Sequence, residues 1–182
     1  MKTRILFGII ILALASSLAG FAQENTAKSG EESKLAFVIE PIKTIYEKGE
    51  SVEFTFRLAN RSDGKVLVAR TFQLAHFVTL DIVNAEGKRV EWCGRIAGQT
   101  DFARAFVTIS PGESVSKKLI VSCVNKDDRS RAWGYSLEAP GKYVVTGTYR
   151  LPQPEAFFKK LSPNVPAMRG PLSAQPITIE IR

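Results

Sequence analysis

The chain has few of the side chains from which catalytic and metal sites are built. Its 182 residues include one histidine, His76, and two cysteines, Cys93 and Cys123. Two cysteines and one distant histidine do not have the ligand spacing of a zinc site, so we expect no metal and no cofactor. His76 has no serine or cysteine in a nucleophile context beside it, and a catalytic histidine needs such partners. We therefore expect no catalytic residues and no enzyme activity.

Acidic and basic side chains give no stronger functional signal. Asp101 and the pair Asp127-Asp128 are the best candidates for calcium ligands, but Arg129 and Arg131 beside the pair would repel a cation, which favours a solvated loop. The net charge of +7 is scattered among acids. A nucleic-acid surface needs a basic stripe interleaved with aromatic residues, so we expect no nucleic-acid partner.

Only one long apolar run is present, from Ile5 to about Ala19, and it follows Lys2 and Arg4. Small residues, Gly20 and Ala22, stand at −3 and −1 relative to a cut after Ala22. This layout predicts a signal peptide over residues 1–22. We expect an exported protein, periplasmic or extracellular, that touches a membrane only if that segment stays uncleaved. Its removal lowers the net charge from +7 to +5. Residues 23–34 are polar and predict a flexible lead-in.

The two cysteines predict a disulfide, since an even number in an exported protein favours pairing. We place Cys93 at the end of one strand and Cys123 inside another. A Cys93–Cys123 bond would stabilise the fold by about 3–4 kcal/mol in the chain-entropy model. Two separate buried thiols are the alternative.

Short alternating segments about every ten residues predict an all-β domain over residues 35–182. The segments are Leu35–Ile39, Val52–Leu58, Lys65–Arg70, Val78–Ile82, Lys88–Cys93, Phe106–Ile109, Val115–Cys123, Tyr143–Tyr149 and Ile177–Ile181. Ile120 and Val124 lie on the opposite face of their strand from Leu119 and Val121, which predicts a strand covered on both sides. The one helical candidate is Pro154–Leu161. We expect a two-sheet antiparallel sandwich of the immunoglobulin-like kind, with a barrel as the lesser alternative.

Turn residues separate these strands. Asn60 to Gly64 predicts a turn in which Asp63-Gly64 supplies a positive φ, and Asn60-Arg61-Ser62 is also a glycosylation sequon. Pro111-Gly112 and Pro140-Gly141 mark two more turns. A Pro-rich excursion, residues 151–176, precedes the last strand. Long ordered segments of this kind either serve a function or cover an edge strand, and we retain both interpretations.

The order of several phrases is similar to that of secreted immunoglobulin-like domains. They are Tyr46–Val52, Leu58–Ser62, Asp81–Lys88 and the two Pro-Gly turns, Ser110–Val115 and Ala139–Tyr143. Over residues 35–150 the chain resembles the intracellular proteinase inhibitor family and the non-catalytic β-domain of deuterolysin-like lysine-specific metalloendopeptidases. The peptidase half of the second family needs a His-Glu-x-x-His helix, which this chain lacks. The resemblance therefore implies an accessory domain or an inhibitor.

These observations predict a non-enzymatic exported module that binds another exported protein or a protease. A peptidase inhibitor acting through exposed loops is the alternative, and a structural envelope-associated protein is the second alternative. The candidate contact residues lie in the charged loop and in the Pro-rich excursion; they are Arg129, Arg131, Trp133, Tyr135, Phe157 and Phe158. Trp133 and Tyr135 have a second interpretation, as part of a short strand that faces the core.

Overall fold

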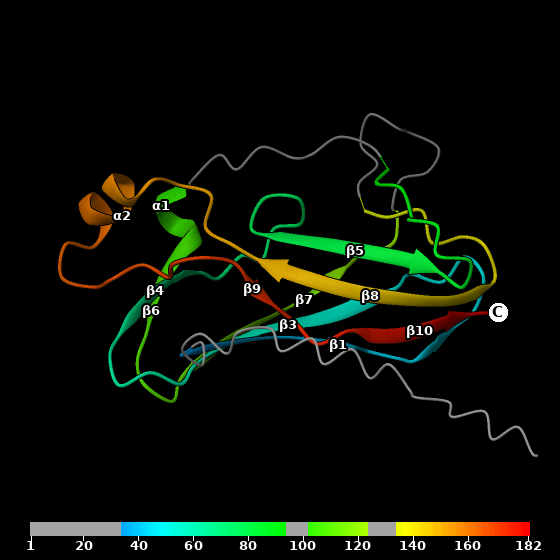
Figure 1. Cartoon of the computed structure of the whole chain (residues 1–182), viewed down its shortest axis with the longest axis horizontal. Coiled ribbons are helices and arrows are strands. Elements are labelled where there is room, and N and C mark those ends of the chain that lie inside the picture. Colours follow the sequence, from blue (N-terminus) through cyan, green and yellow to red (C-terminus); the bar gives the residue numbers. More distant parts are fainter. Residues whose placement is uncertain (1–33, 94–101, 124–133) are drawn as a thin grey trace, which may run out of the picture. The chain divides into compact units, whose positions relative to one another are not determined.

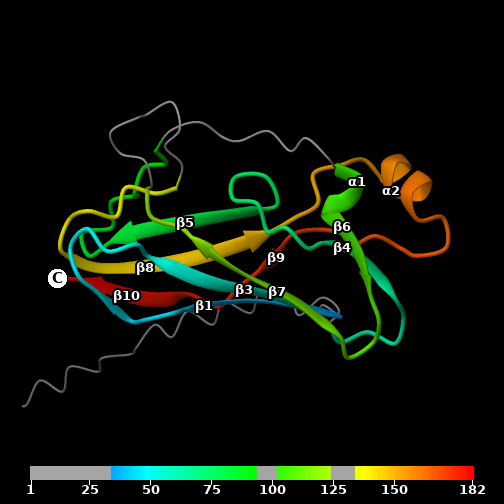
Figure 2. The same cartoon turned by 180° about the vertical axis from the view of Figure 1, so that it is seen from behind.

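The computed structural model describes residues 34–93, 102–123 and 134–182. The predicted signal peptide and all but the last residue of the predicted lead-in lie outside this part of the chain. Strands are the main secondary structure of the described residues, and they form three sheets (Figures 1 and 2). The first sheet has the order β1-β3-β7 and contains Leu35–Pro41, Glu53–Asn60 and Ser114–Ile120. The all-β prediction is thus confirmed at the level of a mostly β chain with several antiparallel sheets.

The second sheet has the order β2-β10-β8-β5, with β9 also paired to β8. Its strands are β2 (Ile45–Tyr46), β5 (Val78–Asn84), β8 (Gly141–Tyr149), β9 (Leu172–Ser173) and β10 (Ile177–Ile181). The third sheet pairs β4 (Val66–Ala69) with β6 (Phe106–Ile109). The helices are α1 (Phe102–Ala105) and α2 (Glu155–Leu161), and neither is long and apolar enough to cross a membrane.

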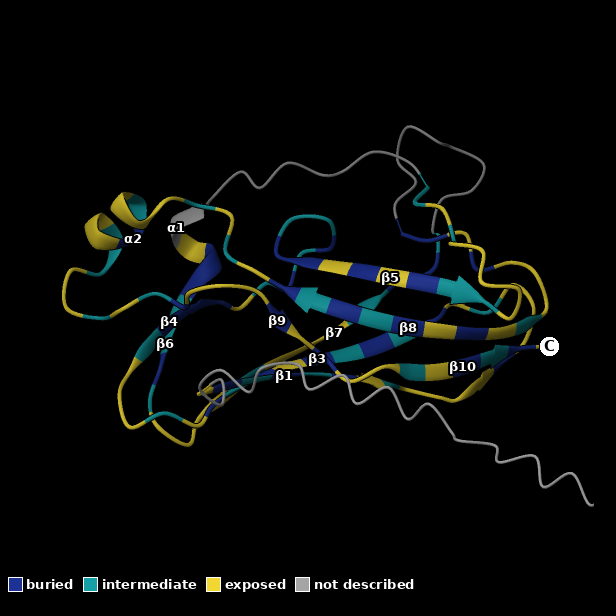
Figure 3. Ribbon diagram, in the orientation of Figure 1, coloured by how far each residue is buried: buried dark blue, intermediate teal, exposed yellow. Residues whose placement is uncertain are grey.

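Alternation of apolar and polar side chains explains why these segments are strands. Phe54, Phe56 and Leu58 of β3 are completely buried, while the residues between them are half-buried or exposed. β5 and β8 alternate in the same way, as the dark blue and yellow bands of Figure 3 show. Side chains at every second position point to one face of a strand, so each of these strands presents one apolar face to the core.

The apolar faces of the first and second sheets pack against each other. The rings of Phe37 on β1 and Tyr149 on β8 lie 5.6 Å apart, centroid to centroid. Gly147 on β8 lies so close to β1 that an added Cβ would be 2.0 Å from Cδ1 of Ile39. A side chain at position 147 is therefore incompatible with the present spacing of the two sheets.

The N-terminal part of the domain contributes a strand to each of the two sheets. β1 pairs with β3, and after Pro41 the chain moves to the second sheet, where β2 runs parallel to β10. Sequence reasoning did not find β2, because two residues are too few to show alternation. The move is held by Tyr46, whose hydroxyl accepts a hydrogen bond from Lys43 N–H (3.2 Å) and donates to Glu53 C=O (3.0 Å).

The turn after β3 differs from its prediction. Gly64 does not have a positive φ, and the buried side chain of Asn60 organises the turn instead. Its Nδ2 donates to Gly64 C=O and Ile109 C=O, and its Oδ1 accepts from Ser62 N–H. Because Asn60 is 1% exposed, its amide is not accessible for glycosylation in the folded chain.

Two further strand predictions were wrong. Residues 88–93 contact β5 through one isolated bridge, of Val83 with Arg89, and a hydrogen bond from Val90 N–H to Ile82 C=O. Trp92 bridges to Tyr135 instead, and the segment forms no regular strand. β7 is an edge strand with no buried side chain, so it is not covered on both sides. Val124, on which that expectation partly depended, lies outside the described residues.

The Pro-rich excursion forms the predicted helix and closes a strand edge. α2 begins directly after Pro154, which confirms the helical segment. Further along, Pro166 C=O accepts a hydrogen bond from Leu67 N–H of β4, and Met168 N–H donates to Leu67 C=O. β9 then pairs with β8. These two hydrogen bonds confirm, for β4, the expectation that the excursion covers an edge strand. Pro166 can take part because a proline, which lacks an N–H group, keeps its carbonyl oxygen as an acceptor.

The contact at Gly147 predicts a coupled pair of substitutions. We expect Gly147→Ala to lower the free energy of unfolding by about 1–3 kcal/mol, because the new methyl group overpacks the core. Ile39→Val alone should cost about 0.5–1.5 kcal/mol, since it removes Cδ1 from a filled core. In the double variant the valine provides space for the alanine, so the two losses should add to less than their sum. Urea unfolding of the four proteins measures this, and strictly additive losses would contradict the described packing.

Candidate functional site

The two cysteines form a disulfide, which confirms their predicted pairing. Their Cα atoms lie 6.1 Å apart. Neither residue lies within a regular strand: Cys93 follows the bridge at Trp92, and Cys123 follows the bridge at Ser122. Arg129, Arg131 and Trp133 lie outside the described residues, as do Asp101 and the pair Asp127-Asp128. Within the described ranges no group of three or more His, Cys, Asp or Glu residues could hold a metal ion.

Tyr135 lies between the two cysteine-bearing segments. Its N–H donates to Val121 C=O, and its C=O accepts from Cys123 N–H. On the other side, Cys93 N–H donates to Gly134 C=O. The Tyr135 ring is buried, and its hydroxyl accepts from Leu80 N–H (3.1 Å) and donates to Leu80 C=O (2.9 Å). Tyr135 therefore faces the core, as its second interpretation expects, and presents little surface to a partner.

Gly134 and Trp92 complete this junction. Gly134 has a φ of +115°, and an added Cβ would lie 2.5 Å from Ser122 O, so only glycine fits there. The Trp92 ring packs edge-on against Tyr135, with centroids 5.1 Å apart. Its indole nitrogen is buried and has no hydrogen-bond partner among the described residues. These contacts make the junction a structural brace.

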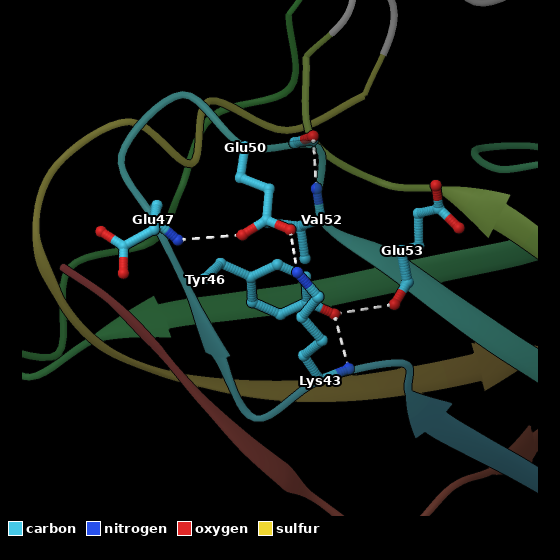
Figure 4. A network of polar contacts seen from close by, with 7 residues as sticks. Lys43, Tyr46, Glu47, Glu50, Val52 and Glu53 are labelled. Atoms are coloured by element: carbon cyan, nitrogen blue, oxygen red, sulfur yellow. Dashed lines mark hydrogen bonds and ion pairs between the residues drawn. The ribbon is translucent and has the colours of Figure 1, made fainter.

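A polar network lies near this brace, at the turn between β2 and β3 (Figure 4). Glu50 forms an ion pair with Lys43, and its second oxygen accepts from Glu47 N–H at 3.1 Å. These bonds hold the pKa of Glu50 below its usual value. Ser122 Oγ accepts from Val52 N–H at 3.0 Å, which links the turn to the end of β7. Exposed ion pairs stabilise little, and the arrangement orders the turn without forming a site.

Phe157 and Phe158, both predicted contact residues, anchor α2 to the third sheet. Phe158 is buried and Phe157 half-buried. The ring centroid of Phe158 lies 5.4 Å from that of Phe106 on β6, and the ring centroid of Phe157 lies 5.7 Å from it. Phe106 in turn packs edge-on against Phe77. The two aromatic rings thus position the helix, although Phe158 also contributes to the cavity beneath it.

A cavity of about 540 Å³ opens between α2 and the chain that follows it. Residues before, within and after the helix line it; they are Leu151, Gln153, Glu155, Phe158, Lys159 and Ser162 to Gly170. Phe158 and Met168 are buried, and Leu151 and Val165 are half-buried, so part of the wall is apolar. This volume is within the range of small-ligand sites. The cavity is the candidate functional site.

Charged side chains stand beside this apolar wall. Glu155 Oε1 lies 3.2 Å from Lys159 Nζ and 3.1 Å from Arg169 Nη2. The hydrogen bond from Lys159, and then the positive charges of Lys159 and Arg169, hold the pKa of Glu155 below its usual value. One carboxylate thus faces two cations, and the group carries a net positive charge.

Gln153 adds an unusual polar atom to the wall. Its Oε1 is buried and has no hydrogen-bond partner among the described residues. Its Nε2 lies 3.3 Å from Nε2 of His76. A buried acceptor without a partner costs free energy, and a ligand N–H or O–H group that reaches it would recover that loss. The cavity therefore combines an apolar wall with positive charge, and one of its lining residues, Gln153, has a buried oxygen without a partner among the described residues.

Sequence reasoning found only part of this site. Phe158 was named as a candidate, but Gln153, Arg169 and Met168 were not, because their approach depends on how the excursion folds back onto β4. The proline content of the excursion was the one available signal. It indicated an ordered segment without showing which side chains it brings together.

His76 predicts a pH dependence of stability. Burial, and then the positive charge of Arg150, lower the pKa of His76 in the folded chain. Its pKa in the unfolded chain is about 6.5. As pH falls below that value, His76 is protonated more readily in the unfolded chain than in the folded chain. The free energy of unfolding therefore decreases until the pH is below the pKa of the folded state. We expect His76→Gln to show a smaller loss of unfolding free energy between about pH 7 and 5 than the unsubstituted chain. Equal losses would show that His76 is not the responsible group.

Comparison with known proteins adds no relative to this description. Neither a protein-family model nor a curated protein matches the chain. The strand arrangement, the disulfide brace and the cavity beside α2 are therefore the basis on which its function is inferred.

Proposed function

We propose that this chain is an exported, non-enzymatic binding module with an immunoglobulin-like β-sandwich fold, and that it binds another exported protein through the cavity beside α2. The strand order supports the fold. In a constant-type immunoglobulin domain one sheet contains strands A, B, E and D, and the other contains C, F and G. Here β1-β3-β7 corresponds to A-B-E, and β10-β8-β5 corresponds to G-F-C.

Two observations support export. The Cys93–Cys123 disulfide is compatible with an oxidising compartment, where such bonds persist. The N-terminal sequence has the charged, apolar and small-residue regions of a signal peptide. Both fit a protein of the periplasm or of the extracellular space.

The cavity carries the binding proposal. Its apolar wall, which includes Phe158 and Met168, suits an apolar side chain of an exposed segment in the partner. The two cations around Glu155 suit an acidic group beside that side chain. Gln153 Oε1 suits a backbone N–H group. The expected ligand is therefore a peptide segment with an apolar residue next to an acidic one.

The same wall supports binding more than catalysis. Its polar groups are amide, hydroxyl and charged side chains, and the nearby His76 contacts the amide of Gln153. An amide does not act as a nucleophile that a histidine base could activate.

A cavity-filling variant tests this proposal. Val165→Trp should occupy the cavity, while Val144→Trp, on the exposed outer face of β8, adds the same group elsewhere. We expect immobilised wild type and Val144→Trp to retain one common protein from the exported fraction of the native host, and Val165→Trp to retain about tenfold less. Circular dichroism checks that both variants fold. Equal retention by Val165→Trp would exclude the cavity as the contact site.

A peptidase inhibitor is the second candidate function. The disulfide favours it, because a covalent cross-link preorganises the chain that it joins, and preorganisation reduces the cost of binding to a protease. The test is inhibition of serine, cysteine and metallo-proteases by the purified protein, before and after reduction. We expect an inhibitor to lose potency on reduction. No inhibition in any class would exclude this function.

A further inference from the structure

We propose that the outer edge of β7 binds an extended acidic segment of another protein as an additional strand of the first sheet. Hydrogen bonds at the two ends of β7 define which groups are free. Val121 N–H donates to Val52 C=O, and Asn60 N–H donates to Glu113 C=O, so odd-numbered residues face β3. The backbone groups of Ser114, Ser116, Lys118 and Ile120 therefore point to the open side.

Within the described residues, no hydrogen bond reaches the outward backbone groups of β7. The outer edges of β4 and β5 are different. Tyr149 Oη bonds both the N–H and the C=O of Ala69 on β4. Tyr135 Oη does the same for Leu80 on β5, and Val90 N–H donates to Ile82 C=O further along that strand. The chain thus uses its own atoms to close these two edges, while no described residue closes the edge of β7.

No described strand lies on the outer side of β7, because β6 pairs elsewhere. β6 immediately precedes β7, yet it pairs with β4. The turn from Ser110 to Glu113 directs the chain from one sheet to the other, and Asn60 holds it: Gly112 N–H donates to Asn60 C=O, and Asn60 Nδ2 donates to Ile109 C=O. If β7 corresponds to strand E, as the proposed fold implies, the unfilled place is that of strand D. The free backbone groups do not depend on that correspondence.

Charge identifies the occupant. Lys117 and Lys118 are exposed in the middle of β7 and have no ion pair among the described residues. Two copies of β7 paired antiparallel about Lys117 would bring lysines opposite or diagonal to each other, which is destabilising. Neighbouring residues of a strand point to opposite faces, so a strand with acidic side chains at alternate positions would place carboxylates next to one of the two lysines. The edge therefore favours an acidic partner strand and disfavours a second copy of this chain.

Synthetic peptides test the preference directly. The probes are labelled, end-capped Thr-Glu-Val-Glu-Val-Glu-Thr and its counterpart Thr-Lys-Val-Lys-Val-Lys-Thr, each about the length of a strand. Fluorescence anisotropy with the purified full chain should show about tenfold tighter binding of the acidic peptide at low salt. Binding should weaken at about 0.5 M salt, because the lysines are exposed. Equal binding of the two peptides would overturn the proposal.

Substitutions in β7 locate the binding. Ser116→Pro removes an outward N–H without breaking a bond to β3 and should weaken acidic-peptide binding about tenfold. Ser116→Ala keeps the N–H and should bind like wild type. The surface variant Lys117→Glu/Lys118→Glu should prefer the basic peptide. This second test does not depend on whether Ser116→Pro folds.

Two outcomes would contradict the location or the occupant. Unchanged peptide preference in Lys117→Glu/Lys118→Glu would show that β7 is not the binding edge. If the wild-type protein forms dimers and Ser116→Pro does not, the occupant of the edge is a second copy of this chain. The cavity variant Val165→Trp should bind the acidic peptide normally, so this proposal and the cavity proposal can fail separately.

Discussion

Buried backbone groups at strand edges need hydrogen-bond partners, and tyrosine hydroxyls supply many of them in this protein. Tyr135 and Tyr149 each bond both backbone groups of one edge residue, Leu80 and Ala69. Tyr46 joins Lys43 to Glu53 where the first strand changes sheets. A hydroxyl both accepts and donates, so one side chain can replace one residue of a neighbouring strand. Burial raises the pKa of Tyr135 and Tyr149, which keeps both hydroxyls protonated and able to donate. The two-sheet packing depends on these closures.

The two surfaces with functional interest lie where such closure is incomplete. At the excursion, helix α2 and the segment paired with β4 leave a cavity lined in part by Gln153, whose buried Oε1 has no hydrogen-bond partner among the described residues. At β7, a whole strand edge keeps its backbone groups free within the described residues. The disulfide junction is the opposite case. There, Gly134 and Tyr135 fill the space between two chain segments, and every contact serves the fold. The two proposed binding surfaces and the disulfide junction are thus different parts of the molecule.

Sequence reasoning predicted the elements whose signals are local. Alternation in β3, β5 and β8 spans seven or more residues and identifies strands that each bury one face. The helix after Pro154 followed from local composition, and the Cys93–Cys123 pair from the even cysteine count in a chain with a signal-peptide sequence. Pairing partners were beyond reach, because β6 pairs with β4 and not with β7, the strand that follows it. Asn60, whose amide donates to Ile109 C=O at the end of β6, reads in sequence only as a turn residue. The two-residue strands β2 and β9 are too short to alternate. Gln153 and Arg169 meet across the cavity only after the excursion has folded back onto β4.

The place of β10 in the second sheet affects when the fold can form during synthesis. β10 lies between β2 and β8, and it is the last strand of the sequence. Until residues 177–181 have left the ribosome, β2 has no neighbour to pair with, and β8 lacks its partner on that side. Pairing the beginning of the domain with its end also closes the longest loop in the structure, which is a slow step. The order of the strands therefore postpones completion of the second sheet until β10 has been made.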